Sequence, residues 1–126
     1  MRSKDITGQV GEDIAAEYLC THGHQILERR WRNARGELDL ITRDGEQLVA
    51  VEVKTRRGTG YGHPLEAVNP LKLARVHRLL LDYCAEMHCL GTPRRVDVVA
   101  VLLSSASTPH AGEHLLRGLE HLKDVH

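Results

Sequence analysis

The chain of 126 residues has the length of a single domain, 1–126, and its 41% hydrophobic and 27% charged residues are typical of a soluble globular protein. Its 17 basic and 17 acidic side chains cancel, so the net charge does not indicate a nucleic-acid partner. Neither an apolar run of the roughly 20 residues needed to span a membrane nor an apolar signal segment is present, so we expect a cytoplasmic protein with no membrane partner.

The first predicted element is a helix over residues 7–21. Apolar side chains recur at helical spacing over residues 10–19 and would form its buried face. Thr7 can cap the first turn, and Gly23 can end the helix. A strand over residues 24–31 is predicted next.

Two further strands form a predicted hairpin over residues 37–43 and 48–55. Asp44-Gly45 lies between them, and this dipeptide tolerates the positive φ angles of a tight turn. A glycine-rich connection over residues 58–64 follows the hairpin.

A second helix is predicted over residues 70–89, because Asn69 can cap its first turn and Pro70 suits the first helical position. Residues 95–103 are a nearly continuous β-branched run, typical of a strand buried on both faces. Residues 114–125 fit either a strand with a short helical turn or one helix. The order helix, three strands, helix, strand predicts an α/β domain with a mixed sheet flanked by helices.

Three charged side chains, Asp39, Glu52 and Lys54, interrupt the apolar hairpin. Glu52 and Lys54 share one face of their strand because side chains alternate. A two-residue Asp44-Gly45 turn puts Asp39 on that face and diagonal to Glu52, and a Gly45-Glu46 or four-residue turn puts it directly opposite Glu52. A three-residue turn would put Asp39 on the other face. An even turn therefore predicts two carboxylates and a lysine on one surface.

This group of charges has two interpretations. Two crowded carboxylates suit Mg²⁺, which keeps much of its hydration and is held by one or two protein carboxylates. Such an ion can polarise a phosphoryl oxygen while a lysine orients the attacking water, which is the equipment for phosphodiester hydrolysis. The alternative is a cross-strand salt bridge at the end of a sheet, since the spacing D…ExK is frequent by chance.

Basic side chains in three places are candidates for nucleic-acid binding. Trp31 lies among the arginines of residues 29–35, and a mixture of basic and aromatic side chains is typical of nucleic-acid surfaces. The alternative is a core Trp31 beside a solvated, arginine-rich strand edge. Lys72 falls in the first helical turn, where the dipole disfavours a cation, so a nearby phosphate or carboxylate would explain it; a solvent-facing side chain is the other interpretation. The candidates are Arg29, Arg30, Arg32, Arg35, Arg56, Arg57 and Lys72.

Five segments, in this order, carry a resemblance: GEDIAAEYL, GELDLI, LVAVEVKTRR, HPLEAVNPLKLARV and RVDVVAV. Together they resemble the YraN-like family of small bacterial proteins, which is similar to the archaeal Holliday-junction resolvases within the PD-(D/E)xK nuclease superfamily. The resemblance covers nearly the whole chain and implies a restriction-endonuclease-like αβββαβ core, the order that the residue patterns also predict.

The resemblance also implies a site. It makes Asp39 the first metal aspartate, Glu52 the second acidic ligand and Lys54 the catalytic lysine, with Mg²⁺ or Mn²⁺ as the cofactor. Glu12, in the helix motif GEDIA, matches an additional glutamate of the resolvase-like members. The proline that precedes the aspartate in the superfamily signature is absent, since Leu38 occupies its place.

The activity implied by the resemblance is metal-dependent hydrolysis of DNA, with branched or otherwise structured DNA as the substrate. A homodimer is a further expectation of the resemblance, because two-fold doubling is the simplest way for one small domain to hold two duplex arms. Two alternatives stay open: a nucleic-acid-binding module without turnover, and a protein-interaction adaptor. The sequence favours the nuclease over the adaptor, since an adaptor has no use for charges inside a buried strand.

Overall fold

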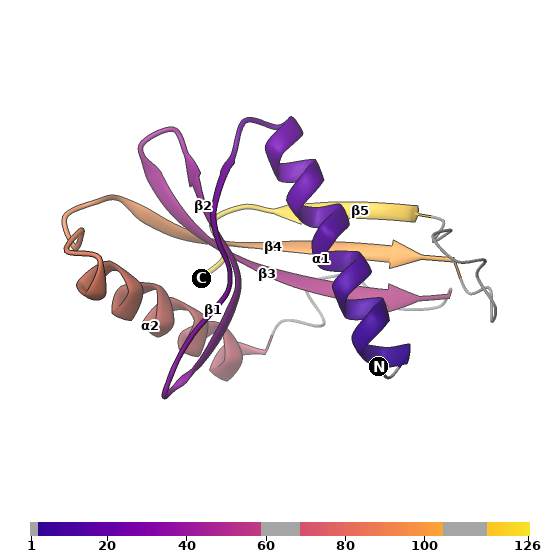
Figure 1. Cartoon of the computed structure of the whole chain (residues 1–126), viewed down its shortest axis with the longest axis horizontal. Helices are drawn as coiled ribbons and strands as arrows, with labels where there is room; N and C mark the ends of the chain where they lie inside the picture. The colour runs from indigo at the N-terminus through magenta and orange to yellow at the C-terminus, as the bar shows by residue number, and fades with distance from the viewer. Residues whose placement is uncertain (1–2, 59–68, 105–115) are drawn as a thin grey trace.

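The computed structural model of the chain describes residues 3–58, 69–104 and 116–126. Its elements in chain order are α1 (Ser3–Thr21), β1 (Gln25–Asn33), β2 (Gly36–Asp44), β3 (Gln47–Arg57), α2 (Pro70–Glu86), β4 (Arg94–Leu103) and β5 (Leu116–Leu122) (Figure 1). The predicted glycine-rich connection lies outside the described residues, apart from its first glycine.

The strands form one five-stranded sheet in the order β1-β2-β3-β4-β5. β3 and β4 are parallel, and every other neighbouring pair is antiparallel. α2 lies between β3 and β4 in the chain, as the crossover of a parallel pair requires. The predicted α/β class, mixed sheet and αβββαβ order are confirmed. The segment predicted as either strand or helix contains β5, a strand antiparallel to β4.

The turn between β2 and β3 has two residues. Asp44 pairs with Gln47, so the turn is the alternative Gly45-Glu46, and the first choice of Asp44-Gly45 is wrong by one position. Gly45 takes the left-handed conformation at φ 61°. The Asp44 carboxylate accepts a hydrogen bond from Arg95 Nη2 at 2.8 Å, which keeps Asp44 in the strand. The turn is even, so the predicted common face of the hairpin's charges follows from this register.

α1 begins at Ser3, earlier than predicted, and Thr7 is not its cap. The Thr7 hydroxyl oxygen accepts a hydrogen bond from Arg57 Nε at 2.9 Å, so it already has a partner on β3. Gly23, at φ 92°, follows the helix in the left-handed conformation that ends it, as predicted.

α2 begins as the sequence predicts. The side-chain oxygen of Asn69 accepts hydrogen bonds from the backbone N–H groups of Leu71 at 2.9 Å and Lys72 at 3.1 Å, and Pro70 opens the helix. The helix ends at Glu86, a few residues before the predicted boundary.

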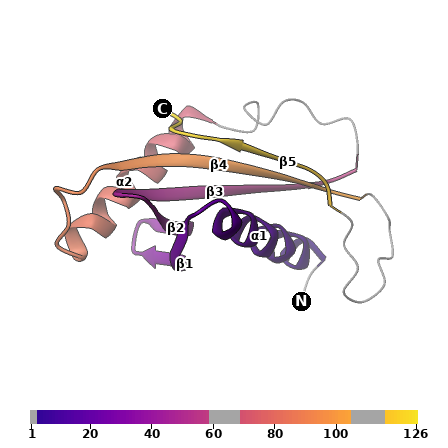
Figure 2. The ribbon, with the colours of Figure 1, turned by 90° about the horizontal axis from the view of Figure 1, so that it is seen from above.

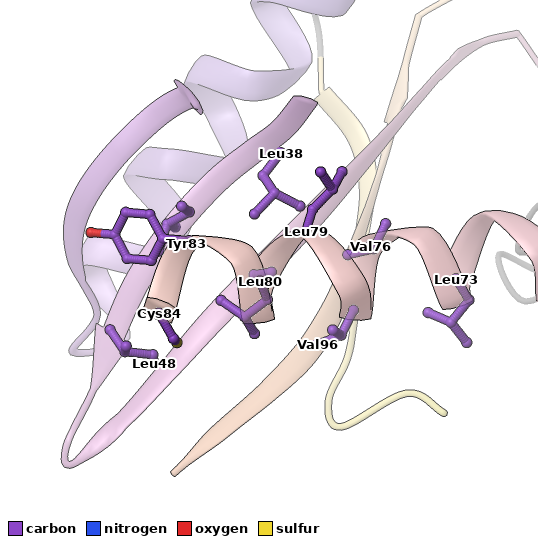
Figure 3. Close-up of a cluster of buried hydrophobic side chains, with 11 residues drawn as sticks. Leu38, Leu48, Leu73, Val76, Leu79, Leu80, Tyr83, Cys84 and Val96 are labelled. Carbon is purple, nitrogen blue, oxygen red and sulfur yellow. The ribbon is translucent and has the colours of Figure 1, made fainter. Parts of the chain in front are cut away.

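The two helices cover opposite faces of the sheet. α1 lies in front of β3 and β4 in Figure 1 and below them in Figure 2. Consecutive residues of β3 alternate between two cores: Val49 and Val51 pack with α1, and Leu48 and Ala50 pack with α2 (Figure 3). Neither described helix has the long apolar stretch that crossing a membrane would need.

Gly11 is a point of close approach between α1 and β3. A Cβ atom at this position would lie 2.7 Å from Thr55 Cγ2 and would overlap Thr55 Oγ1. We expect Gly11→Ala to destabilise the protein by about 1–3 kcal/mol through overpacking, although alanine is the better helix former. Gly8→Ala is the control, because no atom lies within 4 Å of a Cβ there. Urea unfolding should give opposite signs for the two variants; stabilisation by both would contradict the close contact.

Candidate active site

The backbones of β2 and β3 stop pairing beside Asp39. Their pairing ends at Leu40 and Val51, whereas β3 continues next to β4. Asp39 and Glu52 are the next residues along this register. Asp39 Oδ2 accepts a hydrogen bond from the backbone N–H of Val53 at 2.8 Å, so a carboxylate, and not a β2 carbonyl, satisfies that donor. The site therefore forms where the hairpin opens.

Glu52 Oε1 is contacted by two ammonium groups. Lys54 Nζ lies 3.4 Å away and Lys72 Nζ, from the first turn of α2, lies 3.0 Å away. The side chains of Glu52 and Lys54 are 12% and 15% exposed, whereas that of Lys72 is 47% exposed. The expectation of a carboxylate near Lys72 is confirmed. The hollow beside these groups is lined by Glu52, Lys54, Asn69, Lys72, Leu73, Val76 and Val98.

Burial and crowding alter the proton affinities of this site. Burial, followed by the negative charge of Glu52, raises the pKa of Asp39 from 3.8 to about 7. Burial, followed by contact with Lys72, lowers the pKa of Lys54. Contact with Lys54, together with Glu52, raises the pKa of Lys72. The site therefore combines a carboxyl group that binds a proton near neutral pH with a lysine that releases one more readily than usual.

Glu12 contributes to the site from α1. Its Oε1 atom accepts a hydrogen bond from Arg30 Nε at 3.1 Å. Its negative charge also raises the pKa of Asp39, after the larger effects of burial and of Glu52. Arg30 has a φ of 54°, a left-handed conformation that is uncommon for a residue with a side chain. Glu12 is therefore coupled electrostatically to Asp39 while its own carboxylate is paired with Arg30.

The carboxylates of Asp39 and Glu52 fit a hard divalent cation. A buried carboxyl group whose charged form is disfavoured by a second carboxylate is stabilised by a positive ion. No three His, Cys, Asp or Glu side chains gather at a potential metal site within the described ranges. Two carboxylates could hold Mg²⁺ or Mn²⁺, which keeps waters or a phosphate among its remaining ligands.

The arginines of the predicted basic surface have acidic partners. These ion pairs are Arg29 with Asp13, Arg30 with Glu12, Arg32 with Glu37 and Arg35 with Asp82, and the arginine side chains are 43–75% exposed. Arg56 is exposed on β3 and donates to the Thr55 carbonyl at 3.1 Å. The positive charge of residues 29–35 is thus partly neutralised, and its contact with nucleic acid stays a prediction.

Two residues of the predicted surface have structural contacts. The half-buried ring of Trp31 packs edge-on against Tyr83 at the margin of the core, with 5.5 Å between ring centroids, which agrees in part with the interpretation of Trp31 as a core residue. Arg57 donates through Nε to Thr7 Oγ1 and through Nη1 to the Ser104 carbonyl at 3.3 Å. Arg57 therefore ties β3 to α1 and to the end of β4.

A second charged cluster lies in the core and has no counterpart among the predicted site residues. Asp97 is fully buried and accepts hydrogen bonds from Arg95 Nε at 2.9 Å, from His121 Nε2 at 2.8 Å and from the backbone N–H of Asp124 at 3.0 Å. The sequence offers a signal for this cluster: Arg95 and Asp97 are opposite charges two positions apart inside an apolar run. Glu52 and Lys54 have the same spacing.

The fold and the site define a small α/β protein with a carboxylate and lysine cluster where a hairpin opens. Residues 11–101 match the uncharacterised protein family UPF0102. The UPF0102 protein of Arthrobacter sp. (strain FB24) is 52% identical over 116 residues, 91% of this chain and 97% of its own. The UPF0102 protein of Pseudarthrobacter chlorophenolicus is 47% identical over 125 residues, which cover 99% of this chain and 89% of that protein. The chain therefore belongs to UPF0102, the YraN family indicated by its motifs.

Among solved structures, the chain is similar to Pyrococcus furiosus SfsA in complex with Ca²⁺. The TM-score is 0.41 and the sequence identity is 12%, over 92% of this chain. The chain spans 63% of the length of that protein's chain. The α/β class and the αβββαβ order of this protein follow from its own strand pairing.

Proposed function

We propose that this protein is a metal-dependent endonuclease that hydrolyses phosphodiester bonds of DNA. The observation that supports it most directly is the half-buried Asp39 carboxyl group, whose pKa is raised to about 7 by desolvation and by the charge of Glu52. A simple salt bridge between Glu52 and Lys54 would not need a second buried carboxylate beside it. A site that is stabilised by taking up a divalent cation accounts for this crowding.

The proposed roles follow from the positions of the side chains. Asp39 and Glu52 would hold Mg²⁺ or Mn²⁺, which when bound polarises a phosphoryl oxygen and lowers the pKa of a water. Lys54, whose pKa burial lowers, can orient the attacking water or accept its proton. Glu12 adds negative charge near Asp39 and holds Arg30.

The proposed substrate is duplex or branched DNA, bound through its phosphates. The exposed guanidinium groups along β1 and at the end of β3 suit phosphate oxygens, so binding would be salt-dependent and largely independent of sequence. Trp31 is half-buried against Tyr83, which leaves only part of its side chain for stacking on a base. A two-fold homodimer would double this surface for two duplex arms.

A cleavage screen tests the proposal. We expect the protein to cut four-way, flap, duplex or single-stranded DNA with Mg²⁺ or Mn²⁺, and Asp39→Asn or Lys54→Met to lower the rate by about 100-fold or more. Asp13→Asn is the control: it also replaces a carboxylate by an amide, at the exposed pair with Arg29, and should cut at the wild-type rate.

Two results would contradict the proposal in different ways. Equal rates for wild type and Asp39→Asn would assign the cleavage to a contaminating nuclease. Salt-sensitive DNA binding with no cleavage by either cation would instead leave a binding module on this fold.

A further inference from the structure

Lys72 and Lys54 contact the same carboxylate oxygen but differ in how firmly they are held. Lys54 is on β3, two residues from Glu52, and its side chain is mostly buried. Lys72 reaches Glu52 from α2, and about half of its side chain is exposed. A lysine on a separate element with a half-exposed side chain can leave the carboxylate without disturbing the sheet.

Lys72 also occupies a position that does not favour a cation. It lies in the first turn of α2, where the helix dipole is positive, and Asn69 caps this end of the helix through the N–H groups of Leu71 and Lys72. The ion pair with Glu52, with 3.0 Å between Nζ and Oε1, offsets that repulsion. If Glu52 bound another cation, Lys72 would lose the partner that holds its charge at this end of α2.

With Asp39 ionised, as above its pKa of about 7, the two carboxylates and the two lysines of the site balance without a divalent ion. Asp39 and Glu52 supply acidic groups, and Lys54 and Lys72 supply basic ones. Adding a doubly charged cation leaves an excess of positive charge, which is relieved when an ammonium moves away and an anion arrives. A phosphate of bound nucleic acid is such an anion, and the positive end of a helix favours it.

We propose that Lys72 is an exchangeable counter-ion: it pairs with Glu52 while the site holds no divalent cation, and it contacts a phosphate of the nucleic acid once Glu52 binds the cation. The inference rests on the proposed function and adds to it a positioning residue from α2. Lys72 then competes with the metal and cooperates with the nucleic acid. Replacing Lys72 should therefore raise the affinity for the metal and lower the affinity for nucleic acid. A lysine with a merely structural role would not change these two affinities in opposite directions.

The experiment measures both affinities of the full chain without turnover. Calorimetric titration with Mn²⁺ in the absence of DNA should show Lys72→Met binding Mn²⁺ about 3- to 10-fold more tightly than wild type, as expected for the loss of a partly exposed competing ion pair. Fluorescence anisotropy with a four-way junction and Ca²⁺ should show the same variant binding DNA about 3- to 10-fold more weakly, with a salt slope reduced by about 1.

Two control variants separate this exchange from general charge effects. Lys72→Arg keeps the charge and should retain affinities close to wild type. Arg75→Met removes an exposed positive charge from the same helix and should leave the Mn²⁺ affinity unchanged. Melting curves for each variant verify that it is folded.

The outcomes distinguish the inference from the proposed function. Absence of Mn²⁺ binding by both wild type and Lys72→Met would overturn the metal site and the inference together. Mn²⁺ binding by wild type with an unchanged affinity in Lys72→Met would overturn the inference alone and leave the metal site standing. Tighter Mn²⁺ binding together with weaker DNA binding by Lys72→Met supports the exchange.

Discussion

Asp39→Asn should make the metal-free protein more stable at pH 8, although it removes a group of the proposed site. The folded protein holds the Asp39 proton with a pKa of about 7, whereas the unfolded chain holds it near 3.8. Between these pH values the folded state binds a proton that the unfolded state has released, so the wild type loses stability as pH rises through this window. Asparagine does not ionise, and its side-chain oxygen can still accept from the Val53 N–H.

The expected gain is large for a single substitution. Each unit of pKa difference corresponds to about 1.4 kcal/mol, so Asp39→Asn should be more stable than wild type by on the order of 2–4 kcal/mol at pH 8. Near pH 4 the two proteins should be about equally stable, because Asp39 is protonated in the folded wild type. Urea unfolding at pH 4, 6 and 8 in the presence of a chelator measures the difference.

A matched control and the metal dependence complete this prediction. Asp13→Asn makes the same chemical change at an exposed ion pair with Arg29 and should change stability little at any of these pH values. Mn²⁺ should raise the melting temperature of wild type and not that of Asp39→Asn. A variant that is less stable than wild type at pH 8 would show that the Asp39 carboxylate stabilises the fold and is not crowded.

The arrangement of the hairpin could be predicted because it depends on local rules. Alternation along β3 puts Glu52 and Lys54 on one face, and an even turn brings Asp39 to the same face whichever two residues form it. The turn itself was predicted one position early, because Asp44 is held in β2 by Arg95, a residue about fifty positions along the chain. Sequence patterns therefore predict which charges meet more reliably than they predict where a turn begins.

The partners of the arginines could not be predicted, since they come from elements distant in the sequence. Arg29 and Arg30 meet acids of α1, and Arg35 meets Asp82 of α2. A run of basic residues in the sequence says nothing about which helix will be folded against it. The same limit applies to the contact between Lys72 and Glu52, whose existence depends on where α2 docks; the helix dipole predicted only that some anion should be near.

The Asp97 cluster shows a different kind of charged group, one that stabilises the fold. Burial by itself would raise the pKa of Asp97, but hydrogen bonds from His121, from Arg95 and from the backbone N–H of Asp124 lower it to about 2. These donors come from β4, from β5 and from the residues after β5, so a single carboxylate joins three parts of the chain. Asp39 is half-buried and Asp97 is fully buried, yet both are partly desolvated and their pKa values are shifted in opposite directions.

Asp97→Asn should therefore destabilise the protein strongly, by about 3–5 kcal/mol at pH 7, because it leaves the guanidinium of Arg95 buried beside a neutral amide. Arg95 is 9% exposed and also donates to the Asp44 carboxylate and to Gln47 Oε1, which lessens the loss without removing it. Urea unfolding measures the change, and the double variant Arg95→Met with Asp97→Asn should recover part of it, since no unpaired buried charge then remains.

The contribution of Asp97 to the free energy of unfolding depends on pH with the opposite sign to that of Asp39. The folded pKa of Asp97 lies below the value of 3.8 in the unfolded chain, so its stabilisation is fully present above about pH 4 and is lost as pH falls toward 2. Asp97→Asn should lack this part of the acid transition. Asp124→Asn is the matched control, because it changes an exposed carboxylate and keeps the backbone N–H that Asp97 accepts. Equal stabilities of Asp97→Asn and Asp124→Asn at pH 7 would show that Arg95 finds sufficient compensation elsewhere, and that the Asp97 carboxylate is not needed to hold β5 against β4.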